Sequence, residues 1–167
     1  MHDELTSVDM EKMRQELHER ETVLMPKILE DVKTARAFGD LSENFEYKAA
    51  KQEQRKNMSR IRYLKQMLAS AVVIDTASAE DEVGLFDKVT LFMEDDGEEM
   101  VVRFVTTLRQ NPLENLISKE SPLGKAVVGR KVGERRFVRV SEDYSYWVEI
   151  RAIEKGADDE SLEIIAY

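Results

Sequence analysis

Two carboxylates, Asp40 and Glu43, stand three residues apart in a short polar turn between two long segments of helical period. Residues with this spacing at a helix start share a face, so both side chains can point outward together. Two exposed acids are a poor magnesium site alone, because Mg²⁺ keeps most of its waters unless phosphates or a partner's carboxylates complete the coordination. As half of a shared site, they could hold a Mg²⁺ ion that orients water for in-line attack on a phosphodiester.

The same spacing is typical of a purely structural turn. Gly39 suits the end of one helix, Asp40 suits the N-cap of the next, and Glu43 then falls at the N3 position of a capping box. Acidic side chains also stabilise the positive end of a helix. Spacing alone leaves the cap and the metal role open, and the two are compatible because a cap would fix the turn that aims the acids.

A long first helix precedes the turn. Apolar residues recur at steps of three, four or seven from about residue 8 to Phe38, which predicts a helix about 45 Å long. Thr6 or Ser7 can cap its start. Pro26 removes one backbone hydrogen bond and predicts a kink near residues 22–25.

A second apolar stripe runs from Tyr47 to Ala71 at steps of three and four. Because about three residues join the two helices, they must be antiparallel neighbours. The sequence therefore predicts a helical hairpin over residues 8–70.

The second helix is locally basic. Residues 48–65 contain one acid, Glu53, and seven basic side chains: Lys48, Lys51, Arg55, Lys56, Arg60, Arg62 and Lys65. Four of these cluster beside the apolar seam on a helical wheel: Lys48, Lys51, Arg55 and Arg62. Such a stripe indicates either a solvated face or a surface for phosphates and acidic walls.

Beyond Ala71 the period changes from 3.6 to 2. Strands are predicted at residues 72–75, 88–93, 100–105, 135–140 and 146–153, with an Asp-Gly hairpin turn within residues 94–98. Ser121 and Pro122 start a short helix that ends at Gly129. We expect an α+β protein with a hairpin domain at 1–75, a linker at 76–84 and a small sheet domain at 85–167.

Composition narrows the function classes. The chain has 167 residues, a net charge of -9 and no cysteine, which excludes a disulfide framework, a thiolate nucleophile and a Cys-based zinc site. The charge is uneven: residues 1–75 carry 13 Lys plus Arg against 14 Asp plus Glu, whereas residues 76–167 carry 12 against 20. No apolar run approaches the roughly 20 residues of a membrane span, so we expect a cytoplasmic protein with no membrane partner. Because the hairpin is self-contained, we also expect a monomer.

Three segments resemble one family. The tip, Gly39-Asp40-Leu-Ser-Glu43-Asn44-Phe-Glu46-Tyr47-Lys-Ala-Ala-Lys51, is similar to the hairpin-tip motif of the bacterial Gre transcript-cleavage factors, closer to the GreA branch than to GreB. Ala71–Asp75 and Asn115–Gly129 resemble the interdomain and C-terminal segments of the family in the same order. The similarity spans roughly residues 5–154.

The resemblance implies an accessory factor that is not itself an enzyme. Gre proteins insert their coiled coil into the secondary channel of backtracked bacterial RNA polymerase, which then cleaves its own transcript. By position, Asp40 and Glu43 would help to hold the second Mg²⁺ of the polymerase active site and orient the attacking water, with no cofactor bound stably by the factor alone.

The resemblance also implies contact surfaces. Arg36 and Lys51 match a basic patch of the family, and with Lys48, Arg55 and Arg62 they would meet the RNA 3′ end or the channel walls. The C-terminal domain would have an FKBP-like fold and dock on the polymerase. The expected docking residues are Ser121, Pro122 and Leu123.

The chain departs from the family pattern in three places. Phe45 stands where many Gre tips have alanine, Pro112 lies in a connection that aligns poorly, and residues 154–167 extend past the usual end. Phe45 keeps a second function open, a Gre-like protein that binds the channel and modulates synthesis without promoting cleavage. A prolyl isomerase or chaperone is a third class, supported only by fold analogy.

Overall fold

The computed structural model describes residues 3–39 and 44–165. The chain forms two compact units. One contains Asp3 and Met10–Val72, and the other contains Glu4–Asp9 and residues 73–165. The first is helical and the second is built on a sheet, so the expected α+β class is confirmed.

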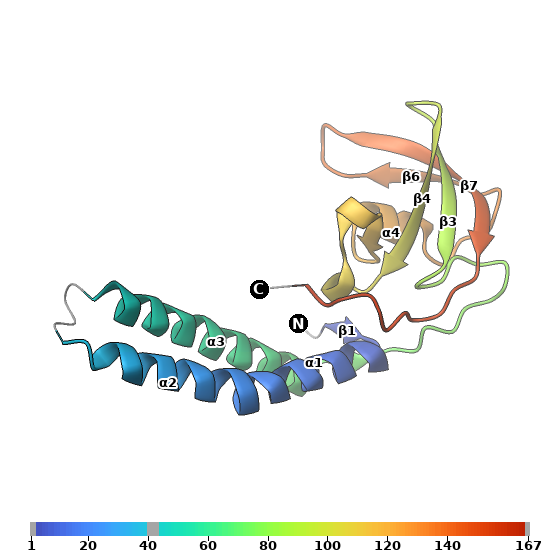
Figure 1. Ribbon diagram of the computed structural model, residues 1–167. Helices are drawn as coiled ribbons and strands as arrows, with labels where there is room; N and C mark the ends of the chain where they lie inside the picture. The colour runs from blue at the N-terminus through green and yellow to red at the C-terminus, as the bar shows by residue number, and fades with distance from the viewer. Residues whose placement is uncertain (1–2, 40–43, 166–167) are drawn as a thin grey trace. The chain divides into compact units, whose positions relative to one another are not determined.

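The first unit is a helical hairpin (Figure 1). Helix α1 covers Ser7–Glu19, a π-helical turn η1 covers Arg20–Leu24, α2 covers Met25–Arg36, and α3 returns over Phe45–Ser70. Thr6 caps α1 as expected: its hydroxyl accepts a hydrogen bond from the Asp9 N–H at 3.1 Å, and the Asp9 carboxylate accepts one from the Thr6 N–H at 3.0 Å. The reciprocal pair is a capping box with Asp at N3.

The irregularity expected near Pro26 is a π-helical turn. Pro26 has no N–H to give to the Thr22 carbonyl, so the α-helical ladder is already broken there. The Met25 N–H bonds instead to the carbonyl of Arg20, five residues back. The helix therefore continues through η1 in a wider register.

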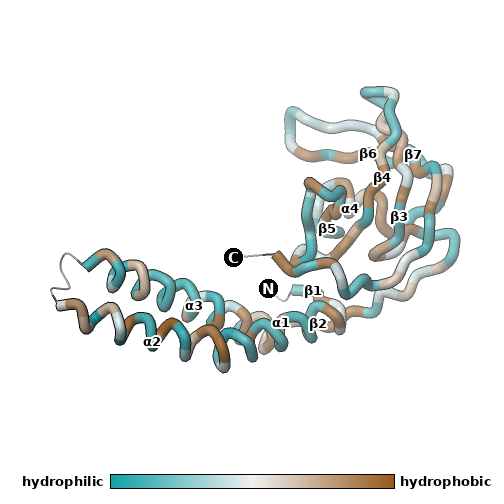
Figure 2. Tube along the Cα trace, in the orientation of Figure 1, coloured by the Kyte–Doolittle hydropathy of each residue, from teal (hydrophilic) through white to brown (hydrophobic). Residues whose placement is uncertain are grey.

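Apolar burial holds the hairpin together. Ile28, Val32 and Ala35 of α2 are buried, as is Leu64 of α3. The seam differs from the predicted stripe on α3, where Met58 is exposed and the buried positions include Asn57 and Arg60. Figure 2 shows hydrophilic and hydrophobic residues alternating along α2 and α3, as expected of amphipathic helices.

The second unit contains a five-stranded sheet of order β5-β4-β3-β7-β6. Its strands are β3 Lys88–Met93, β4 Glu98–Val105, β5 Leu116–Ser118, β6 Arg135–Arg139 and β7 Ser145–Glu154, with the helix α4 at Pro122–Val127. All pairings are antiparallel except β4 with β5. Val89, Leu91, Val102, Phe104, Val148 and Ile150 alternate with less buried residues and form the core with α4.

The short elements were not predicted. These are β1 Glu4–Leu5, β5, and 3₁₀ turns at Thr107–Arg109 and Pro112–Glu114. Strand β1 pairs with β2, Val72–Val73. Runs of two or three residues are too short to show a period, so only tertiary pairing reveals them.

Candidate functional site

The turn of the hairpin is held at both of its described ends. Helix α2 ends at Arg36, and Gly39 adopts a φ of +104°, a conformation that favours glycine. On the other side, the Asn44 Oδ1 accepts a hydrogen bond from the Tyr47 N–H at 2.9 Å. The Asn44 Nδ2 donates to the Ala35 carbonyl at 2.7 Å. One side chain thus caps α3 and bonds it to α2.

This geometry corrects the expected cap. The N-cap of α3 is Asn44 and not Asp40, and the connection from Ala37 to Asn44 is longer than the three residues that the stripes suggested. Asp40 and Glu43 themselves lie outside the described residues, so their metal role stays a prediction.

Two cation–π pairs flank the turn. The Arg36 guanidinium lies 5.7 Å from the Tyr47 ring centroid and donates to the Tyr47 hydroxyl at 3.4 Å. That hydrogen bond lowers the pKa of Tyr47 below its ordinary value. The Lys48 Nζ lies 5.7 Å from the ring centroid of Phe45, which is 81% exposed. An apolar ring and fixed positive charges therefore border the segment that carries the two acids.

The basic stripe on α3 divides by its ion pairs. Arg60, Lys65 and Lys56 are paired with Glu16, Glu21 and Glu53, respectively. Among residues 3–39 and 44–165, no ion pair involves the other four: Lys48, Lys51, Arg55 and Arg62. Lys51 donates instead to the neutral Gln54 at 2.9 Å. The four cations of α3 that were predicted to contact a partner are thus the four that form no ion pair with a described residue.

A polar cluster beside η1 was missed by sequence reasoning. Glu16 accepts from the Arg60 Nε at 2.8 Å and from the Arg20 Nε at 2.9 Å, and Arg20 donates to the Asn57 Oδ1 at 2.9 Å. Burial raises the pKa of Glu16, but the hydrogen bonds from Arg60 and Arg20 outweigh it and lower the pKa overall. Arg60, counted with the basic stripe, is therefore a structural residue.

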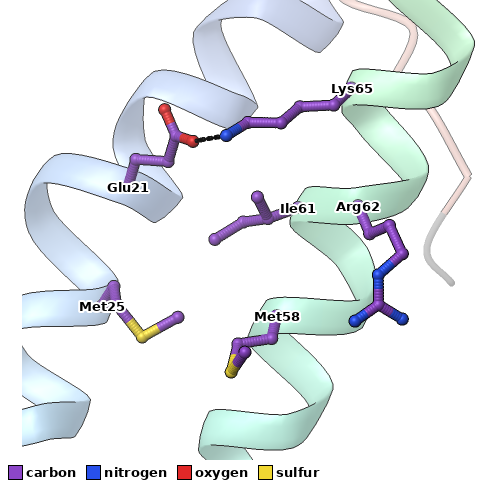
Figure 3. Close-up of a pocket in the computed structure, with 6 residues that line it drawn as sticks. All are labelled: Glu21, Met25, Met58, Ile61, Arg62 and Lys65. Atoms are coloured by element: carbon purple, nitrogen blue, oxygen red, sulfur yellow. Dashed lines mark ion pairs between the residues drawn. The ribbon is translucent and has the colours of Figure 1, made fainter.

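A shallow hollow of about 520 Å³ lies on the same hairpin. Figure 3 shows Met25, Met58 and Ile61 around it, with the Glu21–Lys65 ion pair at 2.5 Å on one side and Arg62 at its edge. Arg62 therefore stands beside an apolar surface, at the end of the unpaired stripe.

The expected docking residues of the second unit have different exposures. Ser121 caps α4 by accepting from the Gly124 N–H at 3.0 Å, Pro122 is exposed, and Leu123 is buried in the core. Ser121 and Leu123 thus hold the helix in place, and Pro122 presents a surface. Gly124 allows the close approach of α4, because a Cβ there would stand 2.5 Å from the Ser118 carbonyl oxygen.

The described part of the chain contains neither a cluster of metal-binding side chains nor a membrane-spanning helix. Residues 3–39 and 44–165 hold no cluster of three His, Cys, Asp or Glu side chains placed to bind a metal ion. No helix in those ranges is both long enough and apolar enough to cross a membrane.

Two family models match this chain, one over most of the hairpin and one over most of the sheet unit. Residues 4–73 match the family model "Transcription elongation factor, N-terminal", and residues 78–155 match "Transcription elongation factor, GreA/GreB, C-term". A transcription elongation factor GreA from Thermotoga neapolitana is 45% identical over 78% of this chain and 83% of its own length. The chain belongs to the GreA/GreB family. The predicted resemblance is confirmed.

Two further matches cover most of this chain. The transcription elongation factor GreA of Oenococcus oeni is 38% identical over 91% of this chain and 94% of its own length. Among solved structures, the GreA factor homolog 1 (Gfh1) of Thermus thermophilus is 26% identical and covers 93% of this chain and 100% of its own, with a TM-score of 0.43. Both family models end before Gly156, so residues 156–167 lie outside the matched region.

Proposed function

We propose that this transcription elongation factor inserts its hairpin into the secondary channel of bacterial RNA polymerase and stimulates cleavage of backtracked transcripts by the polymerase. The supporting observation is the turn: Asn44 joins α3 to α2 directly beside residues 40–43, the segment that carries the two acids. Helix α3 alone is 26 residues, about 39 Å, which gives the turn reach. The factor would bind no metal alone.

Asp40 and Glu43 would act in the polymerase active site. Two carboxylates fit part of a Mg²⁺ coordination shell, and the polymerase and the RNA phosphates would have to supply the remaining ligands. Bound Mg²⁺ supplies Lewis-acid stabilisation and lowers the pKa of water. The two acids would hold and orient the attacking water, and the cap at Asn44 would limit the positions that the acids can take.

The unpaired cations would contact RNA or acidic channel walls. Lys48, Lys51, Arg55 and Arg62 run along α3 away from the turn, and Arg36 stands beside it on α2. An unpaired cation binds a phosphate without first breaking an internal ion pair, so these residues suit the extruded RNA 3′ end. Of the three expected docking residues in the second unit, Pro122 is exposed and would touch the polymerase directly.

The test uses backtracked elongation complexes with Mg²⁺ and RNA labelled at its 3′ end. The unaltered chain is expected to release short labelled fragments, and Asp40→Ala or Glu43→Ala to slow release by about 100-fold or more, as for loss of a group that orients the reacting atoms. Asp31→Ala, an exposed acid on α2, is the matched control and should leave cleavage unchanged. Undiminished cleavage by both tip variants would contradict the mechanism.

A second function is favoured by Phe45. Its exposed ring at the start of α3 would fill space in the channel, so that the chain modulates nucleotide addition without promoting cleavage. The same complexes decide between the two: slowed nucleotide addition with no released fragment would support the modulator. In that case, Phe45→Ala should reduce the inhibition.

A further inference from the structure

A polar groove of about 440 Å³ lies between α4 and β6 in the second unit. Helix α4 contributes Pro122, Lys125 and Ala126, strand β6 contributes Arg136, Phe137 and Arg139, and Glu120 precedes the helix. Three cations thus face a space that holds one acid. Of these residues, sequence analysis had singled out only Pro122.

The groove concentrates unneutralised positive charge in an acidic unit. Residues 76–167 carry 20 acids against 12 bases. Within residues 76–165, seven of those bases form ion pairs with acids, for example Arg135 with Glu94 at 2.8 Å and Lys131 with Asp81 at 3.1 Å. The five bases with no ion pair in that range are Lys88, Lys125, Arg130, Arg136 and Arg139. Three of the five line this groove.

Two features give the groove a defined form. The Arg136 Nε donates to the Ala126 carbonyl at 3.0 Å, which fixes the guanidinium between strand and helix and leaves its other N–H groups to a ligand. Phe137 is 46% exposed and packs against Trp147 with ring centroids 5.1 Å apart and ring planes tilted by 53°. The groove therefore offers a fixed guanidinium, two exposed cations and an apolar ring.

We propose that this groove binds a carboxylate-bearing segment of a protein partner, with an apolar side chain of that segment against Phe137. The inference rests on the proposed function, which makes RNA polymerase the partner. The three cations of the groove are enough to neutralise a short acidic segment. A nucleic acid strand would extend beyond the groove over a surface with an excess of acids, which repels it within the screening distance of about 8 Å.

The experiment measures the Kd of the full chain for purified bacterial core RNA polymerase. Lys125→Glu with Arg139→Glu reverses the charge of the two exposed cations, and Lys125→Gln with Arg139→Gln neutralises them. Both side chains are exposed and make no hydrogen bond or ion pair within residues 3–39 and 44–165, so the substitutions should preserve the fold. The matched control, Lys88→Glu with Arg130→Glu, makes the same change in net charge in the same unit outside the groove.

The reversed variant is expected to bind at least about tenfold more weakly, the neutral variant a few-fold more weakly, and the control within about twofold of the unaltered chain. Equal losses in the groove and control variants would overturn the inference, as would a reversed variant that binds polymerase normally or loses only affinity for a single-stranded RNA probe. In those cases the unaltered chain still binds polymerase, so the proposed function survives. If the unaltered chain does not bind, the proposed function and this inference both fail.

Discussion

Glu16 is a carboxylate whose charge the fold requires. It bonds to Arg60, which is buried, and to Arg20 at the first residue of η1. Asn57 donates at 3.4 Å to the carbonyl of Arg20, the same carbonyl that accepts the π-helical hydrogen bond from Met25, so the cluster is also joined to the backbone of η1. A charged cluster inside a helical seam fixes which residues face one another, because any shift would leave a buried charge unpaired.

The pKa of Glu16 predicts a pH dependence. Because the folded pKa lies below the ordinary value of 4.5, the charge stabilises the hairpin above about pH 4.5, and the stabilisation is lost as pH falls through the folded pKa. Glu16→Gln should reduce the unfolding free energy by about 2 kcal/mol near pH 7. The difference from the unaltered chain should be smaller at an acid pH that lies below the folded pKa of Glu16.

Urea unfolding followed by far-ultraviolet circular dichroism measures this difference at each pH. Glu11→Gln is the control, because Glu11 makes only exposed contacts, a pair with Arg14 at 3.7 Å and a hydrogen bond accepted from Gln15 at 3.3 Å, and its charge should contribute less than about 0.5 kcal/mol. A Glu16→Gln effect that is the same at both pH values would contradict the assignment.

At the scale of the helices, the end of α2 and the start of α3 decide how the turn is built. The cap of α3 depends on a single side chain with two functions, and the acceptor and donor of Asn44 can be separated by substitution. Its acceptor satisfies an N–H in the first turn of α3, and its donor reaches α2. The element that would carry the acids to a partner is thus fixed at the point where the two helices meet.

Asn44→Ala removes both hydrogen bonds and should destabilise the hairpin by about 1–2 kcal/mol. Asn44→Asp keeps the acceptor for the Tyr47 N–H but cannot donate to Ala35, so it should lose about half as much. Thermal unfolding followed by circular dichroism at the helix band measures both. Equal losses for the two variants would mean that the cap contributes nothing, and the transcript-release assay shows whether cleavage falls with the cap.

At the scale of the whole molecule, contacts between residues that are far apart in the sequence hold the second unit together. Arg109 is fully buried and donates from its Nε to Asp9, 100 residues earlier, at 2.7 Å. It also binds Asp158 and donates to the Asp159 carbonyl at 2.7 Å. Burial lowers the pKa of Arg109 and the charge of Asp9 opposes that shift, while the guanidinium remains charged. Within this unit, the side chain of Arg109 therefore joins Asp9 to the segment 158–162.

The region beyond the family match thus has a structural role. Residues 156–165 follow the last residue of the family model, and the Ile165 N–H bonds to the Leu108 carbonyl at 2.7 Å. Asp9 is fully engaged as well, since Thr106 donates to it at 2.7 Å. The C-terminal extension supplies a carboxylate and two carbonyls to the buried guanidinium.

Arg109→Leu should destabilise the second unit by about 3–5 kcal/mol, because it leaves Asp9 buried without a counter-charge. Trp147, the one tryptophan of the chain, lies in β7 and reports unfolding of this unit by fluorescence in urea. Arg103→Leu is the control, since Arg103 makes only weak contacts, a pair with Asp159 at 3.8 Å and a hydrogen bond to the Phe86 carbonyl at 3.3 Å, and should cost about 1 kcal/mol. Similar losses of unfolding free energy in both variants would show that the buried cluster of Arg109 contributes no more stability than the contacts of Arg103.

Local patterns determined much of the architecture. The apolar period predicts the long helices, the alternation over Lys88–Met93 predicts a central strand, and Ser121-Pro122 predicts the start of α4, because each signal lies within one element. The position of the acidic turn followed from the two stripes on either side of it. The docking and metal roles of its residues stay predictions, since they depend on a partner.

Only the tertiary structure decided which charges remain available. The sequence shows seven cations on α3 as one basic run, yet three are neutralised by acids, among them Glu16 and Glu21 from the other arm of the hairpin. Likewise, nothing local distinguishes Arg109, buried between Asp9 and Asp158, from Arg139 in an open groove. Ion pairing acts over a few ångströms in space and not along the chain, so the sequence determined where charges could gather, and the fold determined which of them face a partner.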